Sequence, residues 1–205
     1  MPKSPTKRRP VTVAALSESA LALFTERGFH ATSVSDIVNR AGLTRGAFYS
    51  NFRDKEELFL SLYDAHTDRL LAELARRAED IGDAPDPVAG LFTQLTAHDD
   101  EERAWFLVSM EFTLHAARHP EVARALAGHE ERLNTGIADV LARFLERTGR
   151  ASEVSALTLA RLVVAFFEGL TALEVTHTGD RDTSALVHRA LPHLVRALSR
   201  PEEAG

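Results

Sequence analysis

The sequence contains no cysteine and only one tryptophan among its 205 residues. The absence of cysteine excludes disulfide frameworks, thiol nucleophiles and thiolate metal sites. Long apolar runs are also missing, since the most apolar stretch, Leu162 to Phe167, is far too short to cross a bilayer. No apolar segment follows the basic N-terminus, as one would in a secretory signal. We therefore expect a cytoplasmic protein with no membrane partner.

The charge of the chain is unevenly distributed. The net charge is −6, which by itself argues against a nucleic-acid partner. Residues 1–55, however, hold 9 Lys and Arg against 4 Asp and Glu, a net charge of +5, so the remainder carries −11. Only this N-terminal quarter suits a polyanion, because the acidic remainder would be repelled by phosphates.

Helical periodicity runs through the whole chain. Apolar residues recur at spacings of three and four, and no stretch shows the sustained alternation of a β-strand. The sequence therefore predicts an all-α protein of about nine helices. We expect the first helix to begin near Thr12 and end at Gly28, and the last to run from about Thr183 to Arg200. The segment from Ala104 to Ala117 is apolar on most faces, which predicts a central, buried helix.

The segment 33–52 has the pattern of a helix-turn-helix. Ser33 and Asp36 form a capping-box variant that opens a helix, Gly42 permits a tight turn, and Thr44 is placed to cap a second, short helix. Such helix pairs also occur in proteins that never touch DNA. The pattern alone therefore indicates a helix-turn-helix without fixing its partner.

The short second helix has one apolar and one polar face. Phe48 and Phe52 lie four residues apart and should face a small core. The opposite face carries residue types that suit DNA: Arg45, Gly46, Ala47 and Tyr49. Arginine can fork to O6 and N7 of guanine, small residues let the helix approach the major groove, and tyrosine can donate to phosphate. This face therefore predicts DNA recognition.

The segment ERGFHATSVSDIVNRAGLTRGAFYSNFRDKEELF, with the helix before it, resembles the N-terminal domain of the TetR family of regulators. The resemblance covers about residues 14–63. It is carried by Gly28, Phe29, Thr32, Ser33, Ile37, Ala41, Gly42, Thr44, Arg45, Gly46, Phe48, Tyr49, Phe52 and Lys55.

The resemblance implies specific DNA contacts. Phosphate contacts are implied for Thr32 or Ser33, Thr44, Tyr49 and Lys55. Base contacts are implied for Arg45, Gly46 and Ala47. Asn51 stands where the family often has histidine or tyrosine, but its amide can still donate to a phosphate.

The resemblance also implies an organisation and a function. Residues 1–10 would form a basic flexible tail, 11–54 the DNA-binding domain, and 55–205 an effector-binding and dimerisation domain. The protein would be a ligand-responsive repressor that binds a pseudo-palindromic operator on double-stranded DNA as a homodimer and is released by a small molecule. No cofactor and no metal are expected.

A ligand pocket among the middle helices is implied by the resemblance, and its effector is expected to be partly apolar. Its candidate residues are Leu62, His66, Phe92, Trp105, Ser109, Phe112, His115 and Glu168. The alternative, that these aromatic side chains are ordinary core, stays open. Glu111 and His115, four apart on one helix, could likewise pair with each other or read the ligand.

Two apolar stripes mark the penultimate helix. A helix that is apolar on two stripes must be covered on both, and an identical subunit is one such cover. The alternative is that both stripes are covered within one chain. The residues assigned to the dimer interface are Leu159, Leu162, Val163, Phe166, Leu170, Leu186, Leu191 and Leu194.

Two other classes of protein compete with the regulator. For a helical-bundle enzyme, His129 and Glu130 begin a zinc-protease pattern, but Leu133 stands where its second histidine is required. Glu174 and His177 match one di-iron Glu-x-x-His motif without a second copy. An effector-independent architectural DNA-binding protein would not need a long acidic remainder. We therefore predict no catalytic residues and no enzyme.

Substitution of Arg45 and Lys55 tests the DNA contacts that the resemblance implies. As a base contact, Arg45→Ala should cost about 1 to 3 kcal/mol of binding and relax the sequence preference. As a phosphate contact, Lys55→Ala should weaken binding to all sequences alike and lower the salt slope by about 1. Fluorescence anisotropy on several duplexes over a salt series measures both effects. Unchanged binding in both variants would contradict the assignment.

Overall fold

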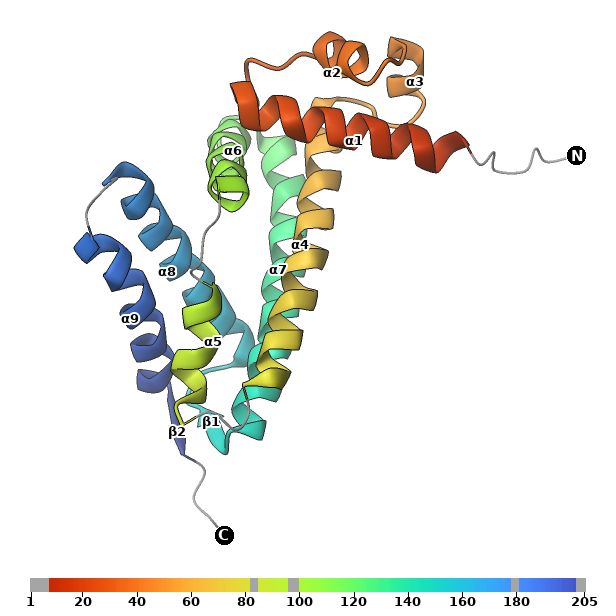
Figure 1. Cartoon of the computed structure of the whole chain (residues 1–205). Helices are drawn as coiled ribbons and strands as arrows, with labels where there is room; N and C mark the ends of the chain where they lie inside the picture. The colour runs from red at the N-terminus through yellow and green to blue at the C-terminus, as the bar shows by residue number, and fades with distance from the viewer. Residues whose placement is uncertain (1–7, 82–84, 96–99, 178–180, 202–205) are drawn as a thin grey trace, which may run out of the picture. The chain divides into compact units, whose positions relative to one another are not determined.

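In the computed structural model, residues 8–81, 85–95, 100–177 and 181–201 are described, and they form nine helices and two short strands (Figure 1). The helices are α1 (Arg8–Arg27), α2 (Val34–Arg40), α3 (Arg45–Tyr49), α4 (Lys55–Asp80), α5 (Pro87–Leu95), α6 (Asp100–Ala116), α7 (Pro120–Arg147), α8 (Ala156–Thr176) and α9 (Arg181–Ala197). The strands are β1 (Arg150–Ser152) and β2 (Ser199–Pro201). The prediction of an all-α fold is confirmed, whereas the small strand pair was not predicted.

The chain divides into two compact units. The first unit comprises residues 1–66 and 100–129, and the second comprises residues 67–99 and 130–205. The two long helices α4 and α7 contribute to both units. The first unit therefore joins the helix-turn-helix to the start of α4, to α6 and to the start of α7.

An aromatic cluster forms the centre of the first unit. Phe59 of α4 stacks on Phe112 of α6 with ring centroids 4.0 Å apart, and Phe29 meets Phe112 edge-on at 5.0 Å. Phe24 of α1 completes the group, and all four rings are buried. Because these rings come from α1, α4, α6 and the turn after α1, the cluster fixes the elements on which the helix-turn-helix rests.

The first helix begins earlier than expected. α1 starts at Arg8 rather than near Thr12, so residues 8–10 of the predicted flexible tail are helical. Pro10 falls within the first turn, where the missing proline N–H would have no helical partner in any case. Residues 1–7 lie outside the described part of the chain.

Only one face of α6 is buried, so the prediction of burial on most faces is wrong. Its buried residues are Trp105, Val108, Phe112 and Ala116. Leu107 and Leu114 remain 43% and 60% exposed. An apolar composition does not reveal how many faces of a helix find neighbours.

The second unit packs α5, α8 and α9 with the second halves of α4 and α7 (Figure 1). Its core includes Phe92, Leu141, Phe144 and Leu159, all at most 1% exposed. The Arg147 guanidinium of α7 donates to a backbone carbonyl near the end of α4. This bond ties the two long helices together at their C-terminal ends.

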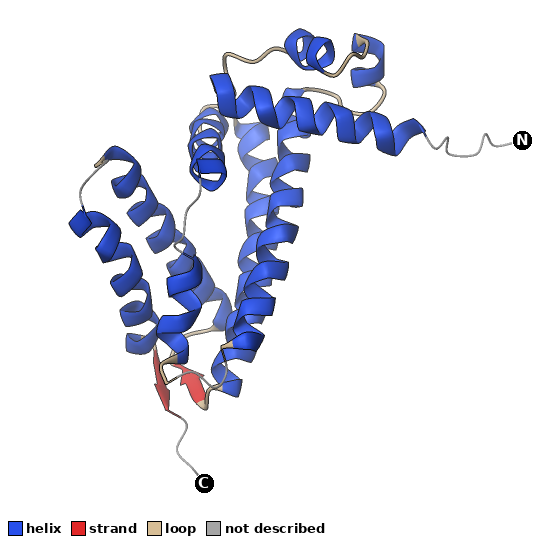
Figure 2. Ribbon diagram, in the orientation of Figure 1, coloured by secondary structure: helices blue, strands red, loops and turns tan. Residues whose placement is uncertain are grey.

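The end of the chain leaves the helix earlier than predicted. α9 stops at Ala197, and β2 then pairs antiparallel with β1 (Figure 2). The Arg150 guanidinium donates to the Ser199 carbonyl at 2.7 Å and to its hydroxyl at 3.0 Å. These bonds fix β2 against β1. Because they join residues far apart in the sequence, local periodicity could not predict them.

α8 is long and apolar enough to cross a membrane by length and composition alone, contrary to the expectation from Leu162–Phe167. It nevertheless buries Leu159, Val163 and Leu170 in the core of the second unit, where it packs along α9. One face of α8 is therefore packed in the core of the second unit, while Leu162, Phe166 and Leu173 stay exposed.

Two substitutions on α6 test its one-sided burial. Phe112→Ala should cost about 3 to 5 kcal/mol of stability, because a fully buried ring leaves a cavity. Leu114→Ala, two residues further along, should change stability by no more than about 0.5 kcal/mol. Urea unfolding followed by circular dichroism measures both. Equal losses in the two variants would contradict the burial described.

Candidate DNA-binding site

Side-chain caps define the two helices of the motif. The Ser33 hydroxyl accepts from Asp36 N–H at 3.2 Å, and the Asp36 carboxylate accepts from Ser33 N–H at 2.9 Å, so the predicted capping box is confirmed. The Thr44 hydroxyl accepts from Ala47 N–H at 3.2 Å and opens α3 as predicted. Gly42 has φ +65° in the turn between them, a value that favours glycine.

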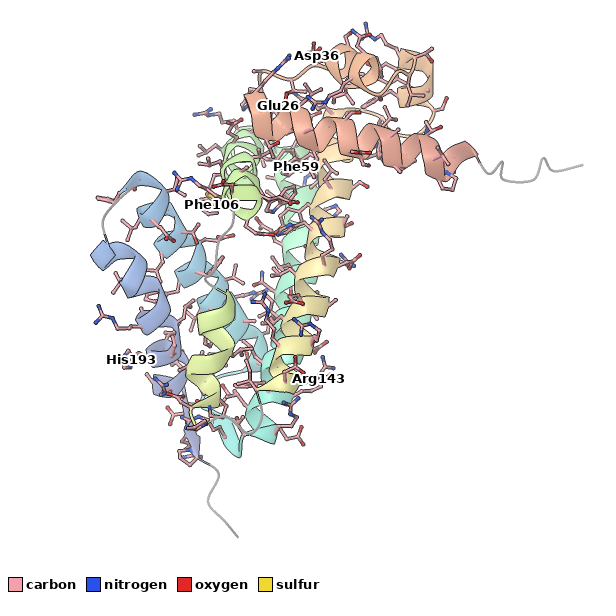
Figure 3. The ribbon with its side chains drawn as sticks, in the orientation of Figure 1. Glu26, Asp36, Phe59, Phe106, Arg143 and His193 are labelled. Carbon is pink, nitrogen blue, oxygen red and sulfur yellow. The ribbon has the colours of Figure 1, made fainter. Side chains whose placement is uncertain are left out.

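An ion pair joins α1 to α2. The Arg40 guanidinium lies 2.7 Å from the Glu26 carboxylate, and Figure 3 labels Glu26 near the end of α1 and Asp36 in α2. Both partners are largely exposed, so the pair contributes little stability by itself.

α3, the short second helix of the motif, buries its apolar face and exposes its polar face as predicted. Phe48 and Phe52 are buried in the core of the first unit, as expected. Arg45 and Gly46 are exposed, and the Tyr49 side chain is 52% exposed. Ser33, Thr44 and the partly exposed Ala47 also reach the surface of the motif. These predicted DNA-contacting residues are therefore at least partly exposed, on α3 and at the caps that open α2 and α3.

Thr32 does not belong to this surface. The residue is 1% exposed, and its hydroxyl donates to the Gly28 carbonyl at 2.9 Å. The predicted phosphate contact from its side chain is therefore wrong, because hydroxyl and methyl are both enclosed by the turn after α1. Of the two alternatives only Ser33 is exposed, and its hydroxyl lies 2.5 Å from the Asp36 carboxylate to which it donates.

The Asn51 side chain is hydrogen-bonded to the backbone of α3. Its amide nitrogen donates to the Ala47 carbonyl at 2.8 Å, just beyond the end of α3. Its side-chain oxygen is buried and has no hydrogen-bond partner among the described residues. The implied phosphate contact stays a prediction and would use the remaining amide hydrogen.

Lys55 turns inward. Its ammonium donates to the carbonyls of Phe29 and Thr32 at 2.6 and 2.7 Å, and it lies 4.2 Å from the centroid of the Phe29 ring. Burial lowers the pKa of Lys55, and the carboxylates of Glu56 and Glu111 partly offset that effect. Two of three ammonium hydrogens are thus used inside the protein, which is a poor arrangement for the implied phosphate contact.

The sequence also failed to indicate the partners of Glu111 and His115. The Glu111 carboxylate accepts from Phe29 N–H at 2.8 Å, 82 residues away in the chain. His115 instead lies 3.1 Å from the Glu56 carboxylate. The suggested pair between Glu111 and His115 is therefore not formed, because each side chain faces a different element.

Two protein-family descriptions match this chain, one in its N-terminal part and one in the remainder. The family described as "Bacterial regulatory proteins, tetR family" matches residues 16–62. The family described as "BetI-type transcriptional repressor, C-terminal" matches residues 84–199, more than half of the chain. The chain belongs to the TetR family of transcriptional regulators.

Individual TetR-family proteins match most of the chain. The HTH-type transcriptional repressor BepR of Brucella suis is 29% identical over 219 residues, which covers 95% of this chain and 97% of BepR. A structure from Rhodococcus sp. assigned to the TetR family has a TM-score of 0.72 at 18% identity, covering 90% of this chain and 98% of that one. FadR of Bacillus subtilis, solved with stearoyl-CoA, has a TM-score of 0.64 at 17% identity, covering 90% and 98%. At these identities the two structures support the fold alone.

The residues predicted for the ligand pocket of this TetR-family protein are divided between the two units. Leu62, His66, Trp105, Ser109, Phe112 and His115 lie in the first unit, and Phe92 and Glu168 lie in the second. Phe92 and Phe112 are at most 1% exposed and pack as ordinary core, which was the open alternative. His66 stacks on Trp105 with ring centroids 4.6 Å apart. Burial raises the pKa of Glu168, and the Glu130 carboxylate raises it further.

Half of the predicted dimer residues are already covered within the chain. Leu159, Val163, Leu170 and Leu191 are at most 8% exposed and belong to the core of the second unit, so their assignment to an intersubunit surface is wrong. Residues three apart on a helix point about 60° away from each other. The stripe predicted on α8 therefore divides into a buried row and an exposed row. Leu162, Phe166 and Leu186 are 40 to 43% exposed, and Leu194 is partly exposed.

The capping box gives a pH-dependent stability. Hydrogen bonds from the Ser33 hydroxyl and the Ser33 N–H hold the pKa of Asp36 below its ordinary value of 3.8. A lowered folded-state pKa stabilises the fold above the ordinary value and is lost as the pH falls through the lowered one. Asp36→Ala should therefore reduce the urea midpoint near neutral pH, and its difference from the wild type should shrink in acid.

Glu18→Ala is the matched control, because Glu18 is an exposed carboxylate on α1. It should change the urea midpoint little at either pH. A gap between Asp36→Ala and the wild type that is equally large in acid and at neutral pH would contradict the capping role of the ionised carboxylate.

Proposed function

We propose that this TetR-family protein is a ligand-responsive repressor that binds a pseudo-palindromic operator as a homodimer. The observation that carries the proposal is the exposed face of α3 on a helix-turn-helix whose other face is fully packed. Two such helices, one per subunit, would enter successive major grooves about 34 to 36 Å apart. The residues 11–54 would then act as the DNA-binding part, and residues 55–205 as the effector-binding and dimerisation part.

The proposed contacts divide by chemistry. Arg45 would read a base edge, with Gly46 and Ala47 allowing close approach of the helix. Thr44 and Tyr49 would hold phosphates on either side. The acidic remainder of the chain supports this arrangement, because it confines counterion release to the N-terminal quarter.

The exposed apolar residues of α8 and α9 support a homodimer. Leu162, Phe166, Leu173 and Leu186 are 40 to 44% exposed. Beside them, a hollow of about 590 Å³ is lined by Phe166, Leu186, Arg189, Ala190, His193, Leu194 and Ala197, and Figure 3 labels His193 on α9. A second copy that covers this surface would remove apolar area from water and make the operator symmetry match the protein symmetry.

A partly apolar small molecule is the proposed effector. Trp105 is buried with His66 stacked on it, and the buried Ser109 hydroxyl, four residues further along α6, has no partner among the described residues. An unpaired buried hydroxyl is costly, so a polar group that reaches it would be favoured. FadR of Bacillus subtilis, a fold neighbour, was solved in complex with stearoyl-CoA, which carries a long apolar acyl chain on a charged CoA group. By linkage, effector and operator would weaken each other's binding by the same factor.

We also propose that the protein acts in the cytoplasm and without catalysis. Regulators rather than enzymes make up the relatives described above. The architectural alternative makes a different prediction, namely equal affinity for all DNA sequences.

A charged substitution on α8 tests the dimer surface. Leu173→Arg should raise the dimer dissociation constant by more than about tenfold, because an arginine would be buried against apolar side chains. Leu107→Arg on α6 is the matched control, since Leu107 is 43% exposed and Leu173 is 44% exposed. Sedimentation equilibrium measures both variants. A dimeric Leu173→Arg, or a wild type that is monomeric, would contradict the proposed surface.

A further inference from the structure

Three backbone groups in the turn between α1 and α2 are held by charged side chains from other helices. Lys55 of α4 donates to the Phe29 and Thr32 carbonyls. Glu111 of α6 accepts from the Phe29 N–H. The peptide groups on both sides of Phe29 are therefore fixed from outside the motif, and charge-assisted bonds of this kind are stronger than neutral ones.

The turn is shaped to admit the Glu111 carboxylate. Gly28 has φ +85°, and a Cβ at this position would lie 2.6 and 2.7 Å from the two carboxylate oxygens of Glu111. A side chain there would push the carboxylate away from Phe29 N–H. Glycine at position 28 thus serves both the backbone conformation and the close approach of α6.

A second contact holds α6 in the same place. His115, one turn after Glu111, lies 3.1 Å from the Glu56 carboxylate, and Glu56 follows Lys55 in α4. The Phe29 ring packs against the same helix, edge-on to Phe112 and 5.4 Å from the centroid of the His115 ring. The turn, the start of α4 and the end of α6 therefore form one polar and aromatic junction inside the first unit.

The turn leads directly into α2. Thr32 closes it through its hydroxyl bond to Gly28, and Ser33 begins the capping box of α2. A change in the backbone at Phe29 would therefore tilt α2 and, with it, the packed α3. The position of the DNA-reading face depends on how the turn is held.

We propose that Glu111 is a positioning residue for operator binding, which acts through the Phe29 amide and links the position of α6 to that of the helix-turn-helix. The inference rests on the proposed function, and it assigns a role to a residue outside the DNA-contacting surface. Glu111 carries a negative charge, so a purely electrostatic effect of its removal would strengthen DNA binding. If Glu111 instead positions the turn, its removal should weaken DNA binding.

Three variants of α6 separate these effects. Glu111→Ala removes the acceptor, Glu111→Gln keeps an oxygen that can accept from Phe29 N–H, and Glu101→Ala removes an exposed carboxylate from the same helix. The probe is a labelled duplex of about 30 base pairs, long enough for two half-sites, taken from the genomic fragment that the wild-type protein enriches most. Binding is measured by anisotropy over a salt series, and folding by urea unfolding.

Glu111→Ala should bind the duplex about tenfold more weakly, the size of effect expected from one charge-assisted hydrogen bond, with an unchanged salt slope. Glu111→Gln should stay within about twofold of the wild type. Glu101→Ala should bind as well as the wild type or slightly better. Lys55→Ala should likewise weaken binding without lowering the salt slope, in contrast to the expectation from sequence.

Amide exchange gives a readout that does not require DNA. In ¹⁵N-labelled protein, the Phe29 amide should exchange faster in Glu111→Ala than in Glu111→Gln. The proposal is overturned if Glu111→Ala binds as tightly as Glu101→Ala, if Glu111→Gln is as weak as Glu111→Ala, or if Phe29 exchange is unchanged. A wild type that enriches no fragment would overturn the proposed function itself.

Discussion

The backbone of the turn between α1 and α2, which leads into the helix-turn-helix, is held by charged side chains from two other helices. Lys55 and Glu111 hold its peptide groups from α4 and α6, and Gly28 supplies the left-handed conformation that brings the turn close to α6. Behind it, Phe29 and Phe112 anchor the turn in the aromatic cluster. The short helices α2 and α3 have little stability of their own, since they are too short to form alone in water.

The helix-turn-helix and α6 share one packed unit and one core. The motif contributes a thin core, in which Phe48 and Phe52 cover only one side of α3. α6 adds Trp105 and Phe112 to the same core and Glu111 to the turn. A displacement of α6 would therefore reach the helix-turn-helix through direct contacts, which is what effector-dependent release of DNA requires.

Local patterns in the sequence predicted the features that depend on local physics. The caps at Ser33 and Thr44 and the inward face of α3 follow from residue type and spacing, and the structure confirms them. Contacts between distant segments were not predictable in this way. Thr32 and Lys55 look like DNA contacts by resemblance, yet their side chains face the turn, and nothing near Glu111 in the sequence points to Phe29. Periodicity likewise predicted two apolar stripes on α8 without showing which of their residues the chain itself covers.

We propose that the exposed face of α3 reads a specific, symmetric DNA site. The most direct test is a selection of genomic fragments with the purified full-length protein, followed by footprinting of the best fragment at low and high salt. We expect one protected, near-palindromic site of about two helical turns that is lost at high salt. Enrichment no greater than that of random DNA, or protection spread evenly along the fragment, would contradict it.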